Sequence, residues 1–146
     1  MVQRPNNIRF LSSIEDISSG EWNSCAGLNH PFTRYEFLYA LEKSKCATNS
    51  TGWQPFHYVD LNQKNEIIAI CPLYIKSHSF GEYIFDHAWA DAYHRYGLEY
   101  YPKLQSAVPF TPVSGKRILI RKELLKNKSI QSKIIDNIIS KASTMN

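Results

Sequence analysis

The apolar residues of the chain follow a helical spacing in two segments. One stripe, formed by Phe37, Leu38 and Leu41, predicts a helix over residues 34–45. A longer stripe predicts a second helix over residues 129–143. Its apolar members are Ile130, Ile134, Ile135, Ile138, Ile139 and Ala142. Each helix therefore has one face that is suited to packing against a sheet.

Polar residues indicate where the helices near the N-terminus begin. Thr33 is followed three residues later by Glu36, a spacing that matches a capping box for the first of these helices. Ser19 is placed to cap an earlier, short helix that contains Trp22. The first half of the chain is therefore expected to hold two helices in succession.

Branched and aromatic residues predict the strands. Residues 8–13 form a short candidate, and residues 53–61 and 67–78 flank the polar turn NQKNE as an antiparallel hairpin. Pro72 lacks a backbone donor, so we expect a bulge or a register break within the second of these strands. A last strand is expected at RILI, residues 117–120. This order of strands and helices predicts an α/β or α+β fold.

Between residues 78 and 112 many aromatic rings stand beside histidines and carboxylates. A helix of about two turns is expected near AWADAYHRYG, with Gly97 as its stop, and the remainder is expected to be irregular. Rings left in water are unfavourable, so we expect an ordered, ring-walled cleft. The polar candidates for this cleft are His78, Glu82, Asp86, His87, Asp91 and Lys103.

Each candidate also has a structural explanation. His78 and His87 suit general bases, yet a buried histidine satisfied by a backbone carbonyl is the commoner case. Glu82 and Asp86 could exchange protons from a ring-lined pocket with raised pKa values, whereas Asp86 could instead cap the short helix. Tyr100 and its neighbour Tyr101 either stack on a substrate or pack against the sheet, and spacing alone names no reaction.

Length, composition and charge narrow the class of protein. The 146 residues suffice for one domain, and an aromatic content of 13% is high for a globular chain. The three cysteines form no Cys-x-x-Cys pair, so no metal site is expected. We expect a cytoplasmic protein, because the N-terminus has no signal-peptide pattern and no segment is long enough for a transmembrane span.

The net charge of +4 comes from basic residues near the C-terminus, which either form a solvated helix face or attract a phosphate-bearing partner. DNA is not expected as a partner, because the chain shows no known nucleic-acid-binding module. The basic residues are Lys116, Arg117, Arg121, Lys122, Lys126, Lys128, Lys133 and Lys141.

Four blocks carry a resemblance to a known family: PFTRYEFLYALEKS, TGWQPFHYVDL, PLYIKSHSFGEYIFDHAWADAY and YYPKLQSAVPFTPVSGKRIL. In this order they resemble the FemAB-like branch of the GNAT (acyl-CoA N-acyltransferase) superfamily, a peptidoglycan biosynthesis and recognition group. The resemblance implies a GNAT-like mixed sheet flanked by helices, with a family-specific insertion at about 78–117. It also implies transfer of an acyl or aminoacyl group to an amine, with acyl-CoA or aminoacyl-tRNA as donor and no tightly bound cofactor.

For such a reaction we expect roles in handling protons for Glu82, Asp86, His87 and Asp91, and no metal. Lys103 and Arg117 would contact anionic groups. The expected substrate-binding residues are His78, Tyr83, Trp89, Tyr100, Tyr101, Lys103 and Arg117. The acceptor would be a small molecule or a peptide, such as a peptidoglycan precursor.

Family members are more than twice as long, and GNAT units continue with a further strand after such a helix. The resemblance therefore implies that residues 1–146 form a single, truncated domain whose partner is the remaining C-terminal half of the fold. No glycine-rich pyrophosphate loop is evident, and VSGKRILIRKELLKNKS has a single glycine. Two alternatives to an enzyme remain, namely a non-catalytic module that recognises a cell-wall precursor or peptide and an inactive truncated product.

Overall fold

The computed structural model describes residues 7–145, and these form two sheets and four α-helices. The architecture confirms the expected α+β class. Every strand pair among the described residues is antiparallel, whereas the resemblance implied a mixed sheet.

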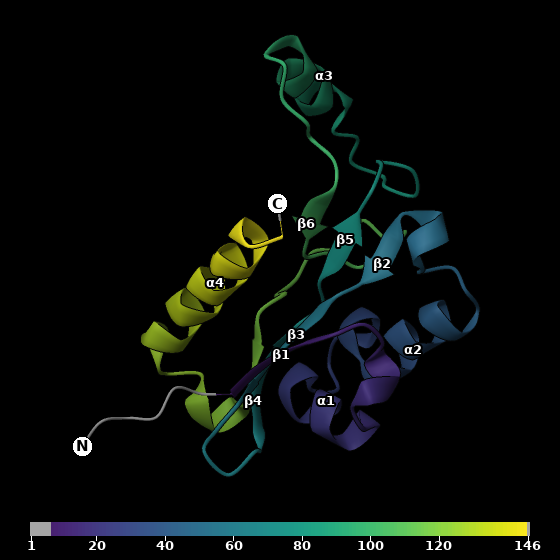
Figure 1. The fold of residues 1–146 in the computed structure, drawn as a ribbon. Coiled ribbons are helices and arrows are strands. Elements are labelled where there is room, and N and C mark those ends of the chain that lie inside the picture. The colour runs from purple at the N-terminus through teal and green to yellow at the C-terminus, as the bar shows by residue number, and fades with distance from the viewer. Residues whose placement is uncertain (1–6, 146) are drawn as a thin grey trace.

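Sheet A forms the centre of the molecule, with the strand order β1-β3-β4-β7 (Figure 1). Its strands are β1 (Asn7–Leu11), β3 (His57–Leu61), β4 (Ile67–Cys71) and β7 (Leu119–Ile120). Both β3 and β4 are buried along their whole length, because helices cover both faces of the sheet. The strands expected near the N-terminus and at RILI are confirmed, although β7 is shorter.

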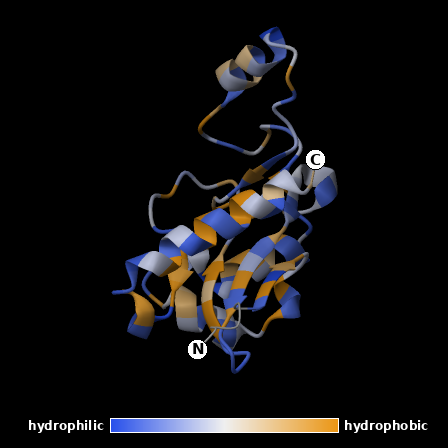
Figure 2. Ribbon diagram, turned by 60° about the vertical axis from the view of Figure 1, so that its left-hand side comes forward, coloured by the Kyte–Doolittle hydropathy of each residue, from blue (hydrophilic) through white to orange (hydrophobic). Residues whose placement is uncertain are grey.

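Helices form the outer layers on the two faces of sheet A (Figure 1). α1 (Ser19–Ala26) and α2 (Tyr35–Lys43) pack on one face through Trp22 and Leu38. α4 (Lys128–Ser143) covers the opposite face through Ile134, and this confirms the C-terminal amphipathic helix. Figure 2 shows the most hydrophobic residues in the strands of sheet A and in the helices beside them. The core around sheet A therefore lies in two layers, one on each side of the sheet, and a third buried cluster of Ala47, Trp53 and Tyr74 lies at sheet B.

Sheet B is smaller and extends the central hairpin beyond sheet A. It consists of β2 (Trp53–Pro55), β5 (Tyr74–Lys76) and β6 (Lys103–Gln105), with β5 in the middle. The predicted hairpin is confirmed, but each of its strands is divided between the two sheets. The expected break at Pro72 is confirmed, since β4 ends just before this residue and β5 begins two residues after it. β6 lies in a segment that we expected to be irregular.

Local contacts correct two helix caps. Ser18, rather than Ser19, caps α1 and forms a reciprocal capping box with Glu21. The capping box predicted from Thr33 and Glu36 is wrong. Arg34 occupies the N-cap position of α2, and the Thr33 hydroxyl instead donates to a backbone carbonyl at 3.2 Å. Tertiary contacts replaced the local pairing, because the Glu36 carboxylate accepts from an asparagine amide of α1.

Residues 77–102, which we call the arm, leave sheet B and return to it (Figure 1). The arm carries α3 (His87–Arg95), and Gly97 stops this helix with a φ of 70°, as expected. The helix has no buried residue. The expectation that the rings of this stretch would be sheltered is wrong for most of them. The exposed large residues of the arm are Phe80, Tyr83, Ile84, Phe85, Trp89, Tyr93, Tyr96 and Leu98.

Candidate functional site

The root of the arm carries four charged side chains in close contact. β5 and β6 pair so that Lys76 lies directly opposite Lys103, and like charges in this arrangement destabilise an antiparallel pair. Two carboxylates of the arm compensate for this. Glu82 Oε1 lies 3.7 Å from Lys76 Nζ, and Asp86 forms an ion pair with Lys103.

Lys76 is the most deeply buried charged residue of this group, with a side chain that is 0% exposed. Its ammonium group donates to the Phe80 carbonyl oxygen at 3.2 Å and lies 3.8 Å from the centre of the Trp53 ring. Burial lowers the pKa of Lys76 below its ordinary 10.5, although the neighbouring Glu82 carboxylate acts in the opposite direction.

Asp86 is held in its charged form. Burial by itself would raise its pKa, but hydrogen bonds from Lys103 and Tyr101 outweigh burial and lower the pKa. The Tyr101 hydroxyl donates to Asp86 Oδ1 at 2.7 Å. Burial, together with this hydrogen bond, raises the pKa of Tyr101 to about 12. For Lys103, burial opposes the effect of Asp86, and the net result is a raised pKa.

These contacts decide between the two explanations for Asp86. The residue occupies the N-cap position of α3, but its side chain makes no capping hydrogen bond. Its carboxylate is instead held by Lys103 of β6 and by Tyr101 at the end of the arm. The capping alternative is therefore wrong, and Asp86 joins the arm to the sheet.

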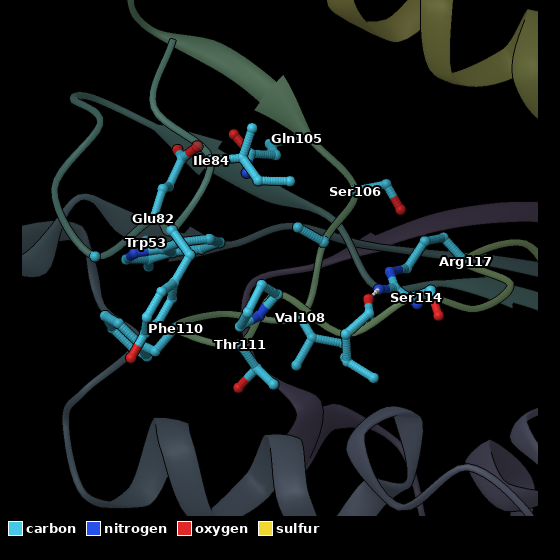
Figure 3. A pocket seen from close by; sticks show the side chains of 15 residues that line it. Trp53, Glu82, Ile84, Gln105, Ser106, Val108, Phe110, Thr111, Ser114 and Arg117 are labelled. Carbon is cyan, nitrogen blue, oxygen red and sulfur yellow. Dashed lines mark hydrogen bonds between the residues drawn. The ribbon is translucent and has the colours of Figure 1, made fainter. Parts of the chain in front are cut away.

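A hollow of about 300 Å³, here called the first hollow, opens beside this charged root (Figure 3). Trp53, Glu82 and Phe110 lie together on one side of it, and Ser114 and Arg117 lie on another. The other side chains that line it are Tyr83, Ile84, Gln105, Ser106, Ala107, Val108, Thr111, Pro112 and Val113, together with Gly81. Its walls come from sheet B, from the arm and from the segment that precedes β7.

Three polar atoms in the walls of the first hollow are buried and form no hydrogen bond with the described residues. They are Trp53 Nε1, Glu82 Oε1 and Gln105 Oε1. The Glu82 side chain is only 9% exposed, and its Oε1 has a charged neighbour, Lys76 Nζ, at 3.7 Å, which is beyond hydrogen-bonding distance. An unsatisfied buried polar group is costly, and it is usually retained where a ligand or a bound water completes it. The hollow thus offers one N–H donor and two oxygen acceptors to a ligand.

A second hollow of about 420 Å³ also has Glu82 in its wall. It shares Glu82, Ile84 and Gln105 with the first hollow, so these three residues form a common wall. Its remaining lining consists of Phe85, Asp86, Trp89, Tyr100, Lys103 and Leu104. Two cavities that meet at one carboxylate could place two different reactants against the same group.

The comparisons with known proteins identify one relation. A family described as FemAB-like, peptidoglycan biosynthesis/recognition, matches residues 13–146, which is most of the chain. The chain belongs to the FemAB-like family. Membership gives it a role in peptidoglycan biosynthesis or recognition. Neither the curated proteins nor the solved structures yield a match to this FemAB-like chain.

The structure gathers most of the predicted site residues of the FemAB-like chain around the two hollows. Tyr83 and Arg117 line the first, and Trp89 and Tyr100 line the second. Glu82 lines both hollows. Asp86 and Lys103 line the second hollow. Tyr101 lines neither hollow, but its hydroxyl donates a hydrogen bond to Asp86.

Besides Tyr101, three predicted site residues lie outside both hollows. His78 is half-buried, and its Nδ1 accepts from the backbone N–H of Phe80 at 3.2 Å, so its partner is a backbone N–H and not the backbone carbonyl considered above. His87 is exposed and stacks on the Phe85 ring. Asp91 is exposed on α3. The proton-handling roles of His87 and Asp91 remain predictions, and neither residue lines the two hollows.

Trp53, Lys76 and Gln105 were missed in the sequence. Trp53 and Lys76 belong to strands that had the pattern of ordinary core strands, and Gln105 lies in a strand that was not predicted. One signal in the sequence was available for Lys76. The break at Pro72 implies that the strand that follows it, which contains Lys76, packs against other elements than the strand before it. No spacing rule connects Trp53 with Gln105, since the contact arises only from the pairing of β2, β5 and β6.

Within residues 7–145, no group of three histidine, cysteine, aspartate or glutamate side chains is arranged to hold a metal ion. Over the same part of the chain, no helix combines the length and the apolar character that crossing a membrane requires.

Proposed function

We propose that this FemAB-like chain is part of an N-acyltransferase of the GNAT type and that it binds the acceptor amine. In this proposal an acyl or aminoacyl group passes to an amine of a peptidoglycan precursor. The observation that carries the proposal is the set of unsatisfied atoms around Glu82. A carboxylate and an amide oxygen suit an ammonium or amine, and an indole N–H suits a carbonyl oxygen. Amine and carbonyl are the two groups that an N-acyl transfer joins.

The chemistry assigned to Glu82 is to bind the acceptor ammonium and to accept one of its protons. The free amine then attacks the carbonyl carbon of a thioester or ester donor. A C–N bond forms while the C–S or C–O bond breaks, and the leaving thiol or hydroxyl group takes up a proton. Trp53 Nε1–H is placed to donate to the carbonyl oxygen as negative charge develops on it. Holding both reactants at one wall supplies much of the remaining rate enhancement.

The donor in this proposal is acyl-CoA or aminoacyl-tRNA, both of which carry phosphates. Arg117 and Lys103 are the cations that line the two hollows. Lys103 is already paired with Asp86, whereas the guanidinium of Arg117 donates to the backbone carbonyl oxygens of Val113 and Lys116. Arg117 is therefore the better placed of the two to contact an anionic donor.

A second function, recognition of a precursor without chemistry, is favoured by a different observation. Trp89 is 67% exposed and lines the second hollow, where its ring offers a flat apolar surface to a sugar or peptide. A recognition module would bind the precursor but would neither bind nor consume a donor.

The decisive experiment supplies acetyl-CoA or alanyl-tRNA together with a peptidoglycan stem peptide that carries a free side-chain amine. Amide formation is followed by mass spectrometry for the wild-type chain and for Glu82→Gln. We expect the substitution to lower the rate by at least about a hundredfold, a size typical for the loss of a group that handles protons. Glu99→Gln is the matched control, because Glu99 is an exposed carboxylate of the arm that lines neither hollow.

Three outcomes distinguish the functions. Amide formation that is lost in Glu82→Gln and kept in Glu99→Gln supports the transferase. Saturable binding of the stem peptide, with no product from either donor, supports recognition alone. Equal rates in both variants remove Glu82 from the reaction.

A further inference from the structure

The lysine buried at the root of the arm has no role in the chemistry described above. We propose that Lys76 is the positioning residue of Glu82, and that its charge also promotes loss of the proton from the acceptor amine. The second part of this inference rests on the proposed transferase function. The first part concerns the structure alone.

The positioning role follows from three contacts that converge on one ammonium group. Lys76 Nζ contacts the Phe80 carbonyl oxygen at 3.2 Å, the Trp53 ring at 3.8 Å and Glu82 Oε1 at 3.7 Å. Phe80 and Glu82 belong to one turn, which is closed by a hydrogen bond from the Glu82 N–H to the Ser79 carbonyl oxygen at 3.3 Å. Lys76 therefore ties this turn to the wall of the first hollow, and the turn sets where the carboxylate lies.

Close packing of the same turn adds to this constraint. Gly81 has a φ of 81°, and a Cβ at this position would approach the Phe110 ring to 2.5 Å and Trp53 Nε1 to 2.9 Å. Only glycine fits so close to both rings with this backbone conformation. The turn is thus fixed from one side by packing and from the other by the lysine.

The electrostatic role follows from the balance of charge around Lys76. The charged groups that face it are Glu82 and Asp86 of the arm and Lys103 of β6, and Trp53 of β2 packs over its ammonium group. Two lysines and two carboxylates are neutral together. An acceptor ammonium that binds at Glu82 adds one positive charge close to Lys76, and repulsion between like charges favours loss of the added proton. The lysine therefore favours the neutral, nucleophilic form of the amine.

The test compares Lys76→Met with Lys76→Arg, which keeps the charge. Lys133→Met is the matched control, because Lys133 is exposed on α4. The first readout is hydrogen exchange of the backbone amides of residues 79–86 in the absence of any substrate. We expect exchange to be at least about tenfold faster in Lys76→Met, since local opening becomes easier when the anchor is lost. Exchange in β3 and β4 should not change.

The second readout is the pH dependence of amide formation from acetyl-CoA and the stem peptide. In the wild-type chain the rate should rise with pH as the bound amine loses its proton. In Lys76→Met this rise should move upward by about one pH unit, because a cation near the amine has been removed. Lys76→Arg keeps the charge and should restore most of the wild-type profile, whereas a purely structural role predicts no shift of the profile in Lys76→Met.

The outcomes separate this inference from the proposed function. Unchanged exchange at residues 79–86 in Lys76→Met overturns the positioning role, whatever the activity. Faster exchange with an unshifted pH profile overturns the electrostatic role. If Lys76→Met does not fold, Glu82→Gln tests the same pair from the other end and must also accelerate exchange of the turn. Loss of the transferase itself would appear instead as an absence of product in the wild-type chain.

Discussion

The body of the molecule and the arm use aromatic residues in opposite ways. In the body, Trp22 and Tyr58 are 0% exposed and pack in the two layers beside sheet A. In the arm, Trp89 and Tyr96 are 67% and 83% exposed. The body thus gains stability from its rings, whereas the arm gains little stability from them and is held at its root by charged contacts. The number of aromatic residues in a segment therefore does not show whether that segment belongs to the core or forms a binding surface.

Substitution of one tryptophan in each region gives the largest contrast. Trp22 is fully buried, and its Nε1–H donates to the Thr33 carbonyl oxygen at 2.9 Å. Trp22→Ala should lower the free energy of unfolding by about 3–5 kcal/mol. Trp89→Ala should change it by no more than about 0.5 kcal/mol. Urea denaturation measures both, and equal losses would show that the arm belongs to the same cooperative core.

Two neighbouring isoleucines of α4 sharpen the same contrast within one helix. Ile134 is 0% exposed against sheet A, and Ile135 is 47% exposed. Ile134→Ala should cost about 2–5 kcal/mol of unfolding free energy, because it leaves a cavity in the core. Ile135→Ala should cost less than about 1 kcal/mol, since most of its surface already contacts water. A larger effect at Ile135 would indicate that this face of α4 is covered in solution.

Loss of the Asp86 charge should loosen the arm and leave the body intact. Asp86→Asn removes the ion pair with Lys103, and local opening of the arm should become easier by about 1–2 kcal/mol. Hydrogen exchange should accelerate in residues 79–103 and stay unchanged in β4. Glu99→Gln removes an exposed charge of the arm and should alter neither region. Faster exchange throughout the body in Asp86→Asn would contradict the division into two regions.

Acid should weaken the same attachment, and the direction follows from the lowered pKa of Asp86. Because the pKa is lower in the folded chain than in the unfolded chain, Asp86 contributes stability above its ordinary pKa of 3.8. This contribution disappears as the pH falls through the lower, folded value. Exchange of the arm in the wild-type chain should approach that of Asp86→Asn as the pH falls from 6 to about 3. A constant difference between the two over this range would contradict the proposed charge state.

Much of the body could be predicted because its pattern is local. The apolar stripes of α2 and α4 each indicate one buried face, and the continuous apolar run of β4 indicates a strand buried on both faces. The break at Pro72 followed from its missing backbone donor. The capping box at Thr33 failed because its side chains found partners in other elements. β6 escaped prediction because three half-buried residues, Lys103–Gln105, carry no strand-like alternation.

The site was less predictable, because it depends on contacts between distant strands. Glu82, Asp86 and Lys103 were predicted from their chemistry, since charged residues among rings are unusual, and the structure places them around the two hollows. The role of Lys76 could not be found in this way. Its burial results from the pairing with Lys103 and the packing of Trp53, which are separated from it by 27 and 23 positions along the chain. His87 and Asp91 were included because of their sequence neighbours, although the helix directs them into solvent.

The most direct test of the proposed acceptor site measures whether Glu82 binds an amine. Isothermal titration compares a stem peptide that has a free side-chain amine with the same peptide after acetylation of that amine. The account predicts that the free amine binds at least about tenfold more tightly, and that this preference is lost in Glu82→Gln and kept in Glu99→Gln. Equal affinity for the two peptides, or a preference that persists in Glu82→Gln, would contradict it.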